Sequence, residues 1–478
     1  MMSSYKEAPE INSVVHTDLP TLTTAYQALR AFHDAGHTKS YASRINVLKA
    51  LKECIVSREK DIKDALYSDF RKPGYEAYLS DIGVVTDELN NTIRHLKSWM
   101  KPRYVPTPLA IFPGYKSRLY PESKGVVAIF APWNYPVNLT FIPLISAIAA
   151  GNTAMVKPAH ETPNTARVIA EIIADVFPPE HVFTVLGEGA VVGPAMLENL
   201  RFDHIFFTGS PTVGKYVMSK AANNLTPVTL ELGGKNPAII DKNCNLPNSV
   251  NRLVWGKFFN AGQTCIAPDY LIIHEEVFDE TIRLLKNRIQ EQFGEDPKKS
   301  PDFARIINEQ RCKKVASYLS QGEILHGGSF QTDECYIEPT IIRVRDYSLP
   351  IIHDEIFGPV WPVTTWKTYD DLLFLIRKNR YPLSTYIYSN QKNTIDFIIQ
   401  NIEFGTGCVN DNMIQFANKS IPFGGIQQSG NGRYHGKTSF DTFSNIKGVV
   451  TSFSWLDQGL KYAPYKKWQE TIAKFFLR

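Results

Sequence analysis

Apolar residues recur every three or four positions through much of the first hundred residues, which is the spacing of amphipathic helices. The pattern runs through 41–55 and again through 82–100, and it predicts helices that pack against a common core. Prolines are then dense between 102 and 113, and they interrupt the helical register before a strand-like stretch at 117–120. We expect this proline-rich segment to project from the body of the protein.

From Gly125 onward, short runs of β-forming residues alternate with helical patterns. Strands are predicted at 126–130, 153–157, 181–187 and 203–209, and each leads into a new segment of the alternation. Repeated strand and helix units of this kind are typical of a parallel sheet that helices cover on both faces. The pattern therefore predicts a doubly wound, Rossmann-like domain that binds a dinucleotide.

A second α/β block is predicted after Glu231. It begins with a strand at 236–240, a helix near 249–259 and a strand at 269–274, and the alternation continues to about residue 446. The fold class predicted from the pattern is therefore α/β, with a doubly wound cofactor domain followed by a second α/β domain.

Composition narrows the class of protein. The formal charge is only +4, from 52 basic and 48 acidic residues, so nucleic acid is not an expected partner. The first twenty residues lack an apolar core behind a basic start, and we expect no secretory signal. Prolines and asparagines interrupt the apolar stretch 126–150, which argues against a membrane-spanning helix. Six dispersed cysteines without metal-site spacing predict no metal and indicate a reducing, cytoplasmic location.

Two glycine-rich turns follow predicted strands. In GEGAVVG, 187–193, the third glycine comes one position later than in a dinucleotide fingerprint, so a plain turn is favoured while the fingerprint stays open. In FTGSPTVG, 207–214, a strand runs into Gly209, Ser210 and Gly214 at a helix start. Free N–H groups and the positive end of the helix dipole suit a pyrophosphate there, although such turns also occur without a ligand.

Three side chains stand where they could do chemistry. Cys265 lies in a loop between a predicted helix and a predicted strand, where it is either a nucleophile or a small buried apolar residue. Glu231 ends a strand before Gly233 and Gly234, and it could act as a general base or form an ion pair or cap. Asn134 could stabilise an oxyanion or close a turn between its flanking prolines. None of the three decides the function alone.

Seven short motifs together resemble the aldehyde dehydrogenase superfamily, in order and roughly at its spacing. They are PWNYP (132–136), MVKPA (155–159), FTGSPTVG (207–214), LELGGKNP (230–237), NAGQTC (260–265), EIFGPV (355–360) and PFGGIQQSG (422–430). The short N-terminus, CIAPDY after the cysteine and the segment 429–444 resemble the class 3 branch of the family. Within that branch, LKSWMKP and NLTPVTLELGG look most like coniferyl aldehyde dehydrogenases.

The resemblance implies the aldehyde dehydrogenase fold, in which a small β-extension joins subunits. The implied parts are a dinucleotide-binding domain at 1–105 and 123–231, a catalytic domain at 232–445, an oligomerisation extension at 106–122 and 446–453, and a C-terminal tail at 454–478. The extension would pair two subunits into a homodimer and cover its exposed edge strands. The tail carries Trp468, Ile472, Phe475 and Phe476 on one helical face, so it either docks against the protein or contacts a membrane surface.

The resemblance also implies a reaction, the NAD(P)-dependent oxidation of an aldehyde to a carboxylic acid. Cys265 would attack the aldehyde carbon and form a thiohemiacetal, whose oxyanion Asn134 and the Cys265 backbone N–H would hold. Hydride transfer to nicotinamide would leave a thioester, and water activated by Glu231 would hydrolyse it. An ordinary thiol pKa of about 8.5 would already supply some thiolate at neutral pH. A thiol esterase or hydrolase and a non-enzymatic binding protein on the same fold are the alternatives.

Nine residues are implied to bind NAD or NADP. They are Trp133, Lys157, His160, Gly209, Ser210, Gly214, Leu232, Glu355 and Phe357. Lys157 and Glu355 would contact ribose hydroxyls, and Phe357 would lie beside the nicotinamide. His160 stands where many NAD-preferring members carry a glutamate that holds the adenosine ribose. Because a 2'-phosphate would then meet no carboxylate, we expect the chain to use both NAD and NADP.

Four aromatic residues could form a substrate tunnel. They are Tyr135, Tyr270, Phe416 and Phe423. Such a tunnel would suit a phenylpropenal such as coniferyl aldehyde or a medium or long alkyl chain, and each residue could instead belong to the core. The sequence leaves both classes of aldehyde open.

Overall fold

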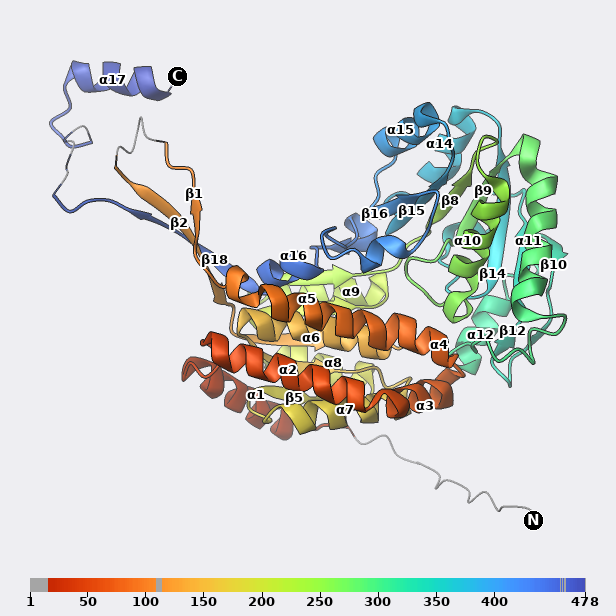
Figure 1. Ribbon diagram of the computed structural model, residues 1–478, viewed down its shortest axis with the longest axis horizontal. Helices are drawn as coiled ribbons and strands as arrows, with labels where there is room; N and C mark the ends of the chain where they lie inside the picture. The colour runs from red at the N-terminus through yellow and green to blue at the C-terminus, as the bar shows by residue number, and fades with distance from the viewer. Residues whose placement is uncertain (1–15, 109–113, 456, 458, 460, 478) are drawn as a thin grey trace, which may run out of the picture.

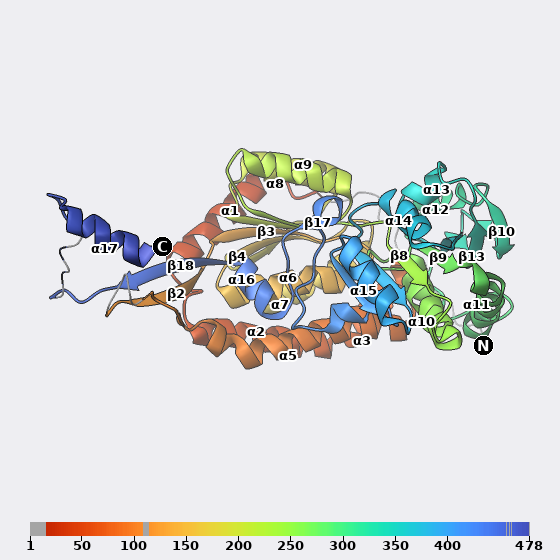
Figure 2. The ribbon, with the colours of Figure 1, turned by 90° about the horizontal axis from the view of Figure 1, so that it is seen from above.

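The computed structural model describes residues 16–108, 114–455, 457, 459 and 461–477. Figures 1 and 2 show two helix-covered sheets that lie end to end, with a thin strand extension and the C-terminal helix projecting from one end. The long N-terminal helices lie along the first sheet, and the second sheet forms the end opposite to the extension.

The first sheet has six strands in the order β17-β7-β6-β3-β4-β5. These strands are β3 (Val126–Phe130), β4 (Thr153–Lys157), β5 (Val182–Thr184), β6 (His204–Thr208), β7 (Val228–Glu231) and β17 (Gly430–Asn431). All neighbouring pairs are parallel except β17 with β7. Strands β3 and β4 have the bounds that the sequence predicts, because runs buried on both faces are legible as strands.

Helices cover both faces of this sheet (Figure 2). One face carries α1 (Leu19–Asp34), α8 (Gly189–Asn199) and α9 (Pro211–Ala222); the other carries α6 (Pro136–Ala150) and α7 (Pro163–Val176), with α2 (Tyr41–Ser57), α3 (Glu59–Phe70) and α5 (Val84–Trp99) outside them. The side chains of β3 alternate between these layers. Ala128 and Phe130 pack on the first face, and Val127 and Ile129 pack on the second.

The N-terminal layer contains one irregular turn. A short helix α4 (Gly74–Ala77) runs into a π-helical turn, η1 (Tyr78–Gly83), which continues into α5. The sequence predicts a regular helix from residue 82 onward, because a π-turn and an α-turn use the same kinds of residue. Such turns are rare, and they often lie near functional sites.

The second sheet has seven strands in the order β10-β13-β14-β9-β8-β15-β16, all parallel except β10 with β13. The strands are β8 (Pro237–Ile240), β9 (Tyr270–His274), β10 (Glu323–His326), β13 (Thr340–Arg343), β14 (Val360–Trp366), β15 (Ser384–Tyr388) and β16 (Thr406–Val409), beside a small pair β11 (Phe330–Gln331) and β12 (Tyr336–Ile337). The helices of this body are α10 (Leu246–Phe258), α11 (Phe278–Phe293), α12 (Glu309–Ala316), α13 (Pro350–His353), α14 (Tyr369–Arg377) and α15 (Lys392–Asn401), with short helical turns η2 (Phe259–Gly262), η3 (Glu275–Val277), η4 (Ile414–Ala417) and η5 (Gln427–Ser429). An apolar core lies on each face of the sheet.

The chain returns to the first sheet before it ends. Gly430 of β17 pairs with Glu231 of β7, and α16 (Gly436–Thr442) packs against α5 and α6. The range 232–445 predicted for the catalytic domain therefore ends too late. A strand of two residues has no periodic pattern, so the sequence does not show that the chain crosses back.

The extension is an antiparallel sheet in the order β1-β2-β18. Its strands are β1 (Arg103–Val105), β2 (Lys116–Ser123) and β18 (Ser444–Thr451), and α17 (Lys467–Leu477) lies beyond its tip (Figure 1). None of the described side chains of α17 is buried. Residues 1–15 and 109–113 lie outside the described residues. The prediction of no secretory signal and the prediction of the extension fall partly on these two stretches. Within the described part of the chain, no helix has the length and apolarity needed to cross a bilayer.

Candidate active site

A cavity of about 460 Å³ lies where the carboxyl ends of the first sheet meet loops of the second body. Ligands commonly bind at this edge of parallel α/β sheets. The residues of its wall that the sequence singled out are Trp133, Asn134, Gly209, Ser210, Glu231, Leu232, Cys265, Glu355 and Phe357. The structure thus brings the thiol, the carboxyl and the amide of the three candidate catalytic residues to one cavity.

Asn134 lies in the loop between β3 and α6, and it is 3% exposed. Its side-chain amide donates to the carbonyl of Gln263 at 3.1 Å, and its own carbonyl accepts from the side chain of Asn260 at 3.0 Å. A side-chain amide has two N–H donors. One donor of Asn134 is therefore committed to the protein, and the second is left for an oxygen in the cavity.

The loop that carries Cys265 begins with a left-handed turn. The φ angles of Asn260, Ala261 and Gly262 are 54°, 52° and 76°. Left-handed conformations are costly for residues other than glycine, so the turn is held by its surroundings rather than by local preference. At Gly262 a side chain would collide with the carbonyl oxygen of Gly358. This turn aims the following residues, including Cys265, toward the cavity.

The thiol of Cys265 is in an environment that disfavours its charge. Burial raises the pKa of Cys265 well above its usual range, and the carboxyls of Glu355 and Glu231 raise it further. A thiol in this environment supplies less thiolate at neutral pH than an ordinary one. Since the thiolate is the nucleophile, attack by Cys265 requires a base that accepts its proton. The loop is fixed by Asn236, whose amide donates to the carbonyl of Cys265 at 2.7 Å.

Glu231 is the last residue of β7, and it is 3% exposed. Neither of its carboxyl oxygens has a hydrogen-bond partner among the described residues. Burial raises the pKa of this carboxyl well above its usual range, although Arg433 opposes the shift. A buried carboxyl without partners is expensive to fold, and such groups gather at catalytic sites. The position of Glu231 at the cavity and its raised pKa are features that acid–base groups of active sites share.

The start of α9 forms a close-fitting wall beside the cavity. Ser210 is its N-cap, and its hydroxyl accepts from the N–H of Val213 at 3.4 Å. A side chain at Gly214 would approach a methyl carbon of Leu232 to 2.7 Å. No side chain covers the backbone at Gly214, and the positive end of the helix dipole suits a pyrophosphate. These residues fit a dinucleotide.

Two aromatic rings and two cations complete this wall. Trp133 and Phe357 meet edge to face with ring centroids 5.4 Å apart. Arg311 lies over the ring of Phe357 at 5.5 Å, and Lys314 follows it on α12. Both cations line the cavity, and no sequence motif pointed to them. Their spacing on a short helix resembles that of any polar surface helix, so no local signal distinguishes them.

Glu355 is held by the backbone and lies near a buried ion pair. It accepts from the N–H of Gly234 at 3.2 Å, while Lys235 pairs with Asp269 at 2.6 Å. Burial raises the pKa of Glu355 to about 8, and the Asp269 carboxylate adds to the effect. The carboxyl is therefore part protonated near neutral pH, and it can donate or accept a hydrogen bond from a hydroxyl.

The segment after β4 differs from the prediction in one respect. His160 lies 3.1 Å from Glu161, and the cavity wall includes Glu161 but not His160. The pKa of Glu161 is lowered overall, because the hydrogen bond from His160 and the charge of Lys157 outweigh its burial. A carboxylate is therefore present after all, one position later than expected. The turn at 187–193 forms the start of α8 and does not line this cavity.

The predicted aromatic tunnel is only partly supported by the structure. Tyr270 is 2% exposed and packs with Ile272 in the core on one face of the second sheet, so it is not a tunnel residue. The hydroxyl of Tyr135 forms a hydrogen bond with Thr264, and Tyr135 is 7% exposed. It therefore connects the loop before α6 to the loop of Cys265. Side chains alternate between the two faces of a strand, and Tyr270 is on the face of β9 that packs into this core.

Phe416 and Phe423 behave differently. Their rings meet at 5.1 Å, and Phe423 also stacks on the buried His435 at 5.2 Å. Phe423 belongs to the core, and the partly buried Phe416 packs against the same core. Neither lines the 460 Å³ cavity.

The sequence profile of the aldehyde dehydrogenase family matches residues 10–449, and the chain belongs to this family. It is an aldehyde dehydrogenase, of a family that uses NAD or NADP. The 4,4'-diaponeurosporen-aldehyde dehydrogenase of Staphylococcus aureus is 42% identical over 94% of this chain and 97% of its own length. Aldehyde dehydrogenase family 3 comG of Dictyostelium discoideum is 40% identical over 95% of this chain and 96% of its own.

A solved structure agrees with the sequence comparison. The substrate-bound state of Staphylococcus aureus AldH superimposes with a TM-score of 0.92 at 41% identity, covering 95% of this chain and 99% of that one. The predicted α/β fold, the predicted family and its class 3 branch are therefore confirmed.

Proposed function

We propose that this aldehyde dehydrogenase oxidises its aldehyde through a thioester on Cys265, with Asn134 and Glu231 as its partners in catalysis. The observation that carries the proposal is their common cavity, in which the carboxyl of Glu231 is buried without a partner. The start of α9 would hold the pyrophosphate of a dinucleotide and Phe357 would lie beside its nicotinamide, which would supply a hydride acceptor.

The chain's own residues account for the other steps. Cys265 gives its proton to a base and forms a C–S bond to the aldehyde carbon, while the carbonyl oxygen becomes an alkoxide. The free amide hydrogen of Asn134 and the backbone N–H of Cys265 hold that alkoxide. After the carbon is oxidised, Glu231 takes a proton from water, which adds to the thioester. The C–S bond then breaks, and the acid and the thiol are released.

Formation of reduced nicotinamide with an aldehyde panel tests the proposal. Cys265→Ser should lose nearly all activity, whereas Cys54→Ser, which changes a partly buried thiol in the N-terminal helices, should retain it. A Cys265→Ser protein at full activity would exclude the mechanism. Ester hydrolysis without nicotinamide reduction would instead favour the thiol hydrolase, and neither activity would favour a binding protein.

We propose an apolar aldehyde as the substrate, either aromatic, such as coniferyl aldehyde, or aliphatic of medium or long chain. The apolar side chains of Trp133, Leu139 and Phe357 line the same cavity as Cys265, and they support an apolar substrate. The panel therefore contains coniferyl aldehyde, alkanals of increasing length and 4,4'-diaponeurosporen-aldehyde, which the name of the Staphylococcus aureus relative specifies. The highest kcat/KM identifies the class, and equal values throughout would contradict an apolar preference.

For the cofactor, we propose use of both NAD and NADP with NAD ahead. The carboxylate of Glu161 lines the cavity, and it would repel a 2'-phosphate. His160 lies against it at 3.1 Å, and this contact moderates the repulsion. This arrangement supports a preference for NAD that is moderate rather than absolute.

We also propose a homodimer in the cytoplasm. The strand β18 is an edge strand of the extension sheet, and the exposed Val449 and Val450 support burial of this surface against a second subunit.

For the tail, the exposed Trp468 and Phe475 of α17 support docking on that second subunit, and membrane contact is the alternative. A reaction that needs the free thiol of Cys265 is suited to a reducing compartment.

A further inference from the structure

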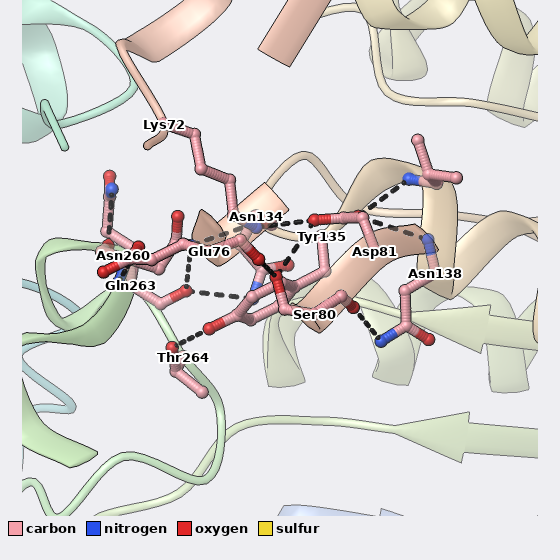
Figure 3. A network of polar contacts seen from close by, with 11 residues as sticks. Lys72, Glu76, Ser80, Asp81, Asn134, Tyr135, Asn138, Asn260, Gln263 and Thr264 are labelled. Atoms are coloured by element: carbon pink, nitrogen blue, oxygen red, sulfur yellow. Dashed lines mark hydrogen bonds and ion pairs between the residues drawn. The ribbon is translucent and has the colours of Figure 1, made fainter. Parts of the chain in front are cut away.

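A buried ion pair lies behind the active site, on the side of the N-terminal helices. The ammonium of Lys72 lies 2.6 Å from the carboxylate of Asp81, and both side chains are fully buried (Figure 3). Such pairs contribute little net stability, because desolvation of the two charges offsets their attraction. An ion pair at this position is therefore better explained by what it holds in place than by stability.

The pair holds the start of α6, directly after Asn134. The second carboxylate oxygen of Asp81 accepts the N–H groups of Val137 and Asn138 at 3.2 and 3.3 Å. The N-cap residue of α6, Tyr135, provides no side-chain cap of its own. Asp81 thus caps the helix from another part of the chain, and the π-turn η1 aims it there.

Tyr135 links this pair to the loop of the nucleophile. The ammonium of Lys72 lies 4.1 Å from the centre of its ring, and its hydroxyl bonds Thr264, the residue before Cys265. In Figure 3 the ring of Tyr135 extends from the region of Asp81 toward Thr264. The Lys72–Asp81 pair therefore contacts the segment that follows Asn134 directly, and it contacts the loop of Cys265 through the ring of Tyr135.

Glu76 anchors the same cysteine loop at its strained end. Its carboxylate accepts the N–H of Asn260 at 2.9 Å, at the first left-handed residue of the turn. The side chain of Asn260 then donates to the carbonyls of Asn134 at 3.0 Å and Gln263 at 3.2 Å. Glu76 thus fixes the residue that ties the two loops together (Figure 3).

We propose that Lys72, Glu76 and Asp81 are positioning residues, which hold the Asn134 loop and the Cys265 loop in the register that attack on the aldehyde requires. This inference rests on the proposed function. None of the three lines the cavity, so each acts through another residue. A misplacement of about 1 Å can cost about a hundredfold in rate, so anchors of this kind affect acylation more than substrate binding.

Glu76→Ala is the first test, with Glu88→Ala as the matched control. Glu88 lies on α5 in the same helical layer, is fully buried and pairs with Lys419 at 3.4 Å, but it contacts neither loop. We expect Glu76→Ala to slow the pre-steady-state formation of reduced nicotinamide by about tenfold or more, with little change in KM. Glu88→Ala should acylate at close to the wild-type rate at a similar loss of stability in urea.

Two outcomes of this comparison would overturn the proposal. One is wild-type acylation by Glu76→Ala, and the other is an equal loss in both variants. If Glu76→Ala does not fold, Glu76→Gln decides the question, since its amide oxygen can still accept the N–H of Asn260. If Glu76→Gln retains most of the wild-type acylation rate and its pH–rate profile differs from the wild type on the acidic side, the result supports a positioning role. An unchanged pH–rate profile overturns the proposal.

The ion pair needs a double variant, because removal of one partner leaves an unpaired buried charge. Lys72→Met with Asp81→Leu should fold with a urea midpoint near wild type and still acylate about tenfold more slowly. Wild-type acylation by this folded variant would overturn the role of the pair. Failure of the proposed function is distinguishable, because Cys265→Ser would then remain active whatever these variants do.

Discussion

The side-chain amide of Asn260 donates to the backbone carbonyl of Asn134 at 3.0 Å, although 126 positions separate the two residues in the chain. This bond joins the loop of Asn134, the proposed oxyanion donor, to the loop of Cys265, the proposed nucleophile. Because hydrogen bonds within the protein fix both loops, the proposed donor need not reorganise when an alkoxide forms. Preorganisation of this kind is often the largest single contribution to catalysis.

Asn134→Ala removes the donor and leaves the thiol in place. Loss of one oxyanion donor typically costs about 100- to 1,000-fold in kcat, and we expect a loss in this range in the acylation step. Rapid-mixing measurement of reduced nicotinamide resolves that step. A burst with wild-type-like hydride transfer would contradict the assignment. Asn199→Ala, which changes an exposed amide at the end of α8, serves as the control.

Glu231→Gln should separate the two halves of the reaction. A neutral amide cannot take a proton from water, so hydrolysis of the thioester should slow by about 100-fold or more. If another group accepts the thiol proton, a burst of reduced nicotinamide should precede slow turnover, and acyl-enzyme should be visible by intact-protein mass spectrometry. Loss of the burst as well would identify Glu231 as the base for Cys265. Rapid turnover without trapped acyl-enzyme is the outcome that excludes both roles.

Glu161→Gln should narrow the preference for NAD over NADP. Removal of the carboxylate abolishes its repulsion of the 2'-phosphate, and we expect the ratio of kcat/KM values to fall by about tenfold. His160→Gln should act in the opposite direction, because it takes away the partner at 3.1 Å. An unchanged ratio in Glu161→Gln, or a wild-type preference for NAD beyond about a thousandfold, would contradict the proposed use of both cofactors.

Glu76 should make stability depend on pH in a defined direction. Burial raises the pKa of Glu76 from 4.5 to about 7, although Lys72 and the N–H of Asn260 lower it and Asp302 raises it further. A carboxyl with a raised folded pKa stabilises the fold below its unfolded pKa, and this contribution is lost as the pH rises through the folded value. Glu76→Gln cannot ionise.

The free energy of unfolding of the wild type should therefore fall relative to Glu76→Gln between about pH 4.5 and about pH 7. Urea titrations across this range measure the difference between the two proteins, which cancels the titration of most other groups. A difference that does not vary with pH would show that Glu76 keeps an ordinary pKa.

Truncation at residue 460 tests the role of the tail. If α17 docks on the partner subunit, the full-length and truncated proteins should be recovered equally in flotation with anionic vesicles. Recovery of only the full-length protein would favour the membrane alternative.

The exposed face of β18 can be tested as the dimer interface. Light scattering of the double variant Val449→Asp with Val450→Asp should show loss of the dimer mass, and an unchanged dimer would exclude this face as the interface.

Much of the fold could be predicted from the chain because its strands are short, apolar and buried on both faces. The run 126–130 is such a strand, and its bounds are as predicted. Tyr270 shows the limit, because its motif lies near the nucleophile while strand parity turns its side chain into a core. The return of 430–442 to the first sheet also went unpredicted, since pairing of two residues leaves no pattern.

The sequence by itself determined which residues could react and which family they belong to, because spaced motifs around Cys265, Glu231 and Asn134 are specific when taken together. Only the tertiary structure decided their environment. The raised pKa of Cys265 and the carboxylate that Glu161 brings to the cavity follow from burial and proximity. These depend on which distant segments meet, and desolvation and Coulomb interactions act through space rather than along the chain.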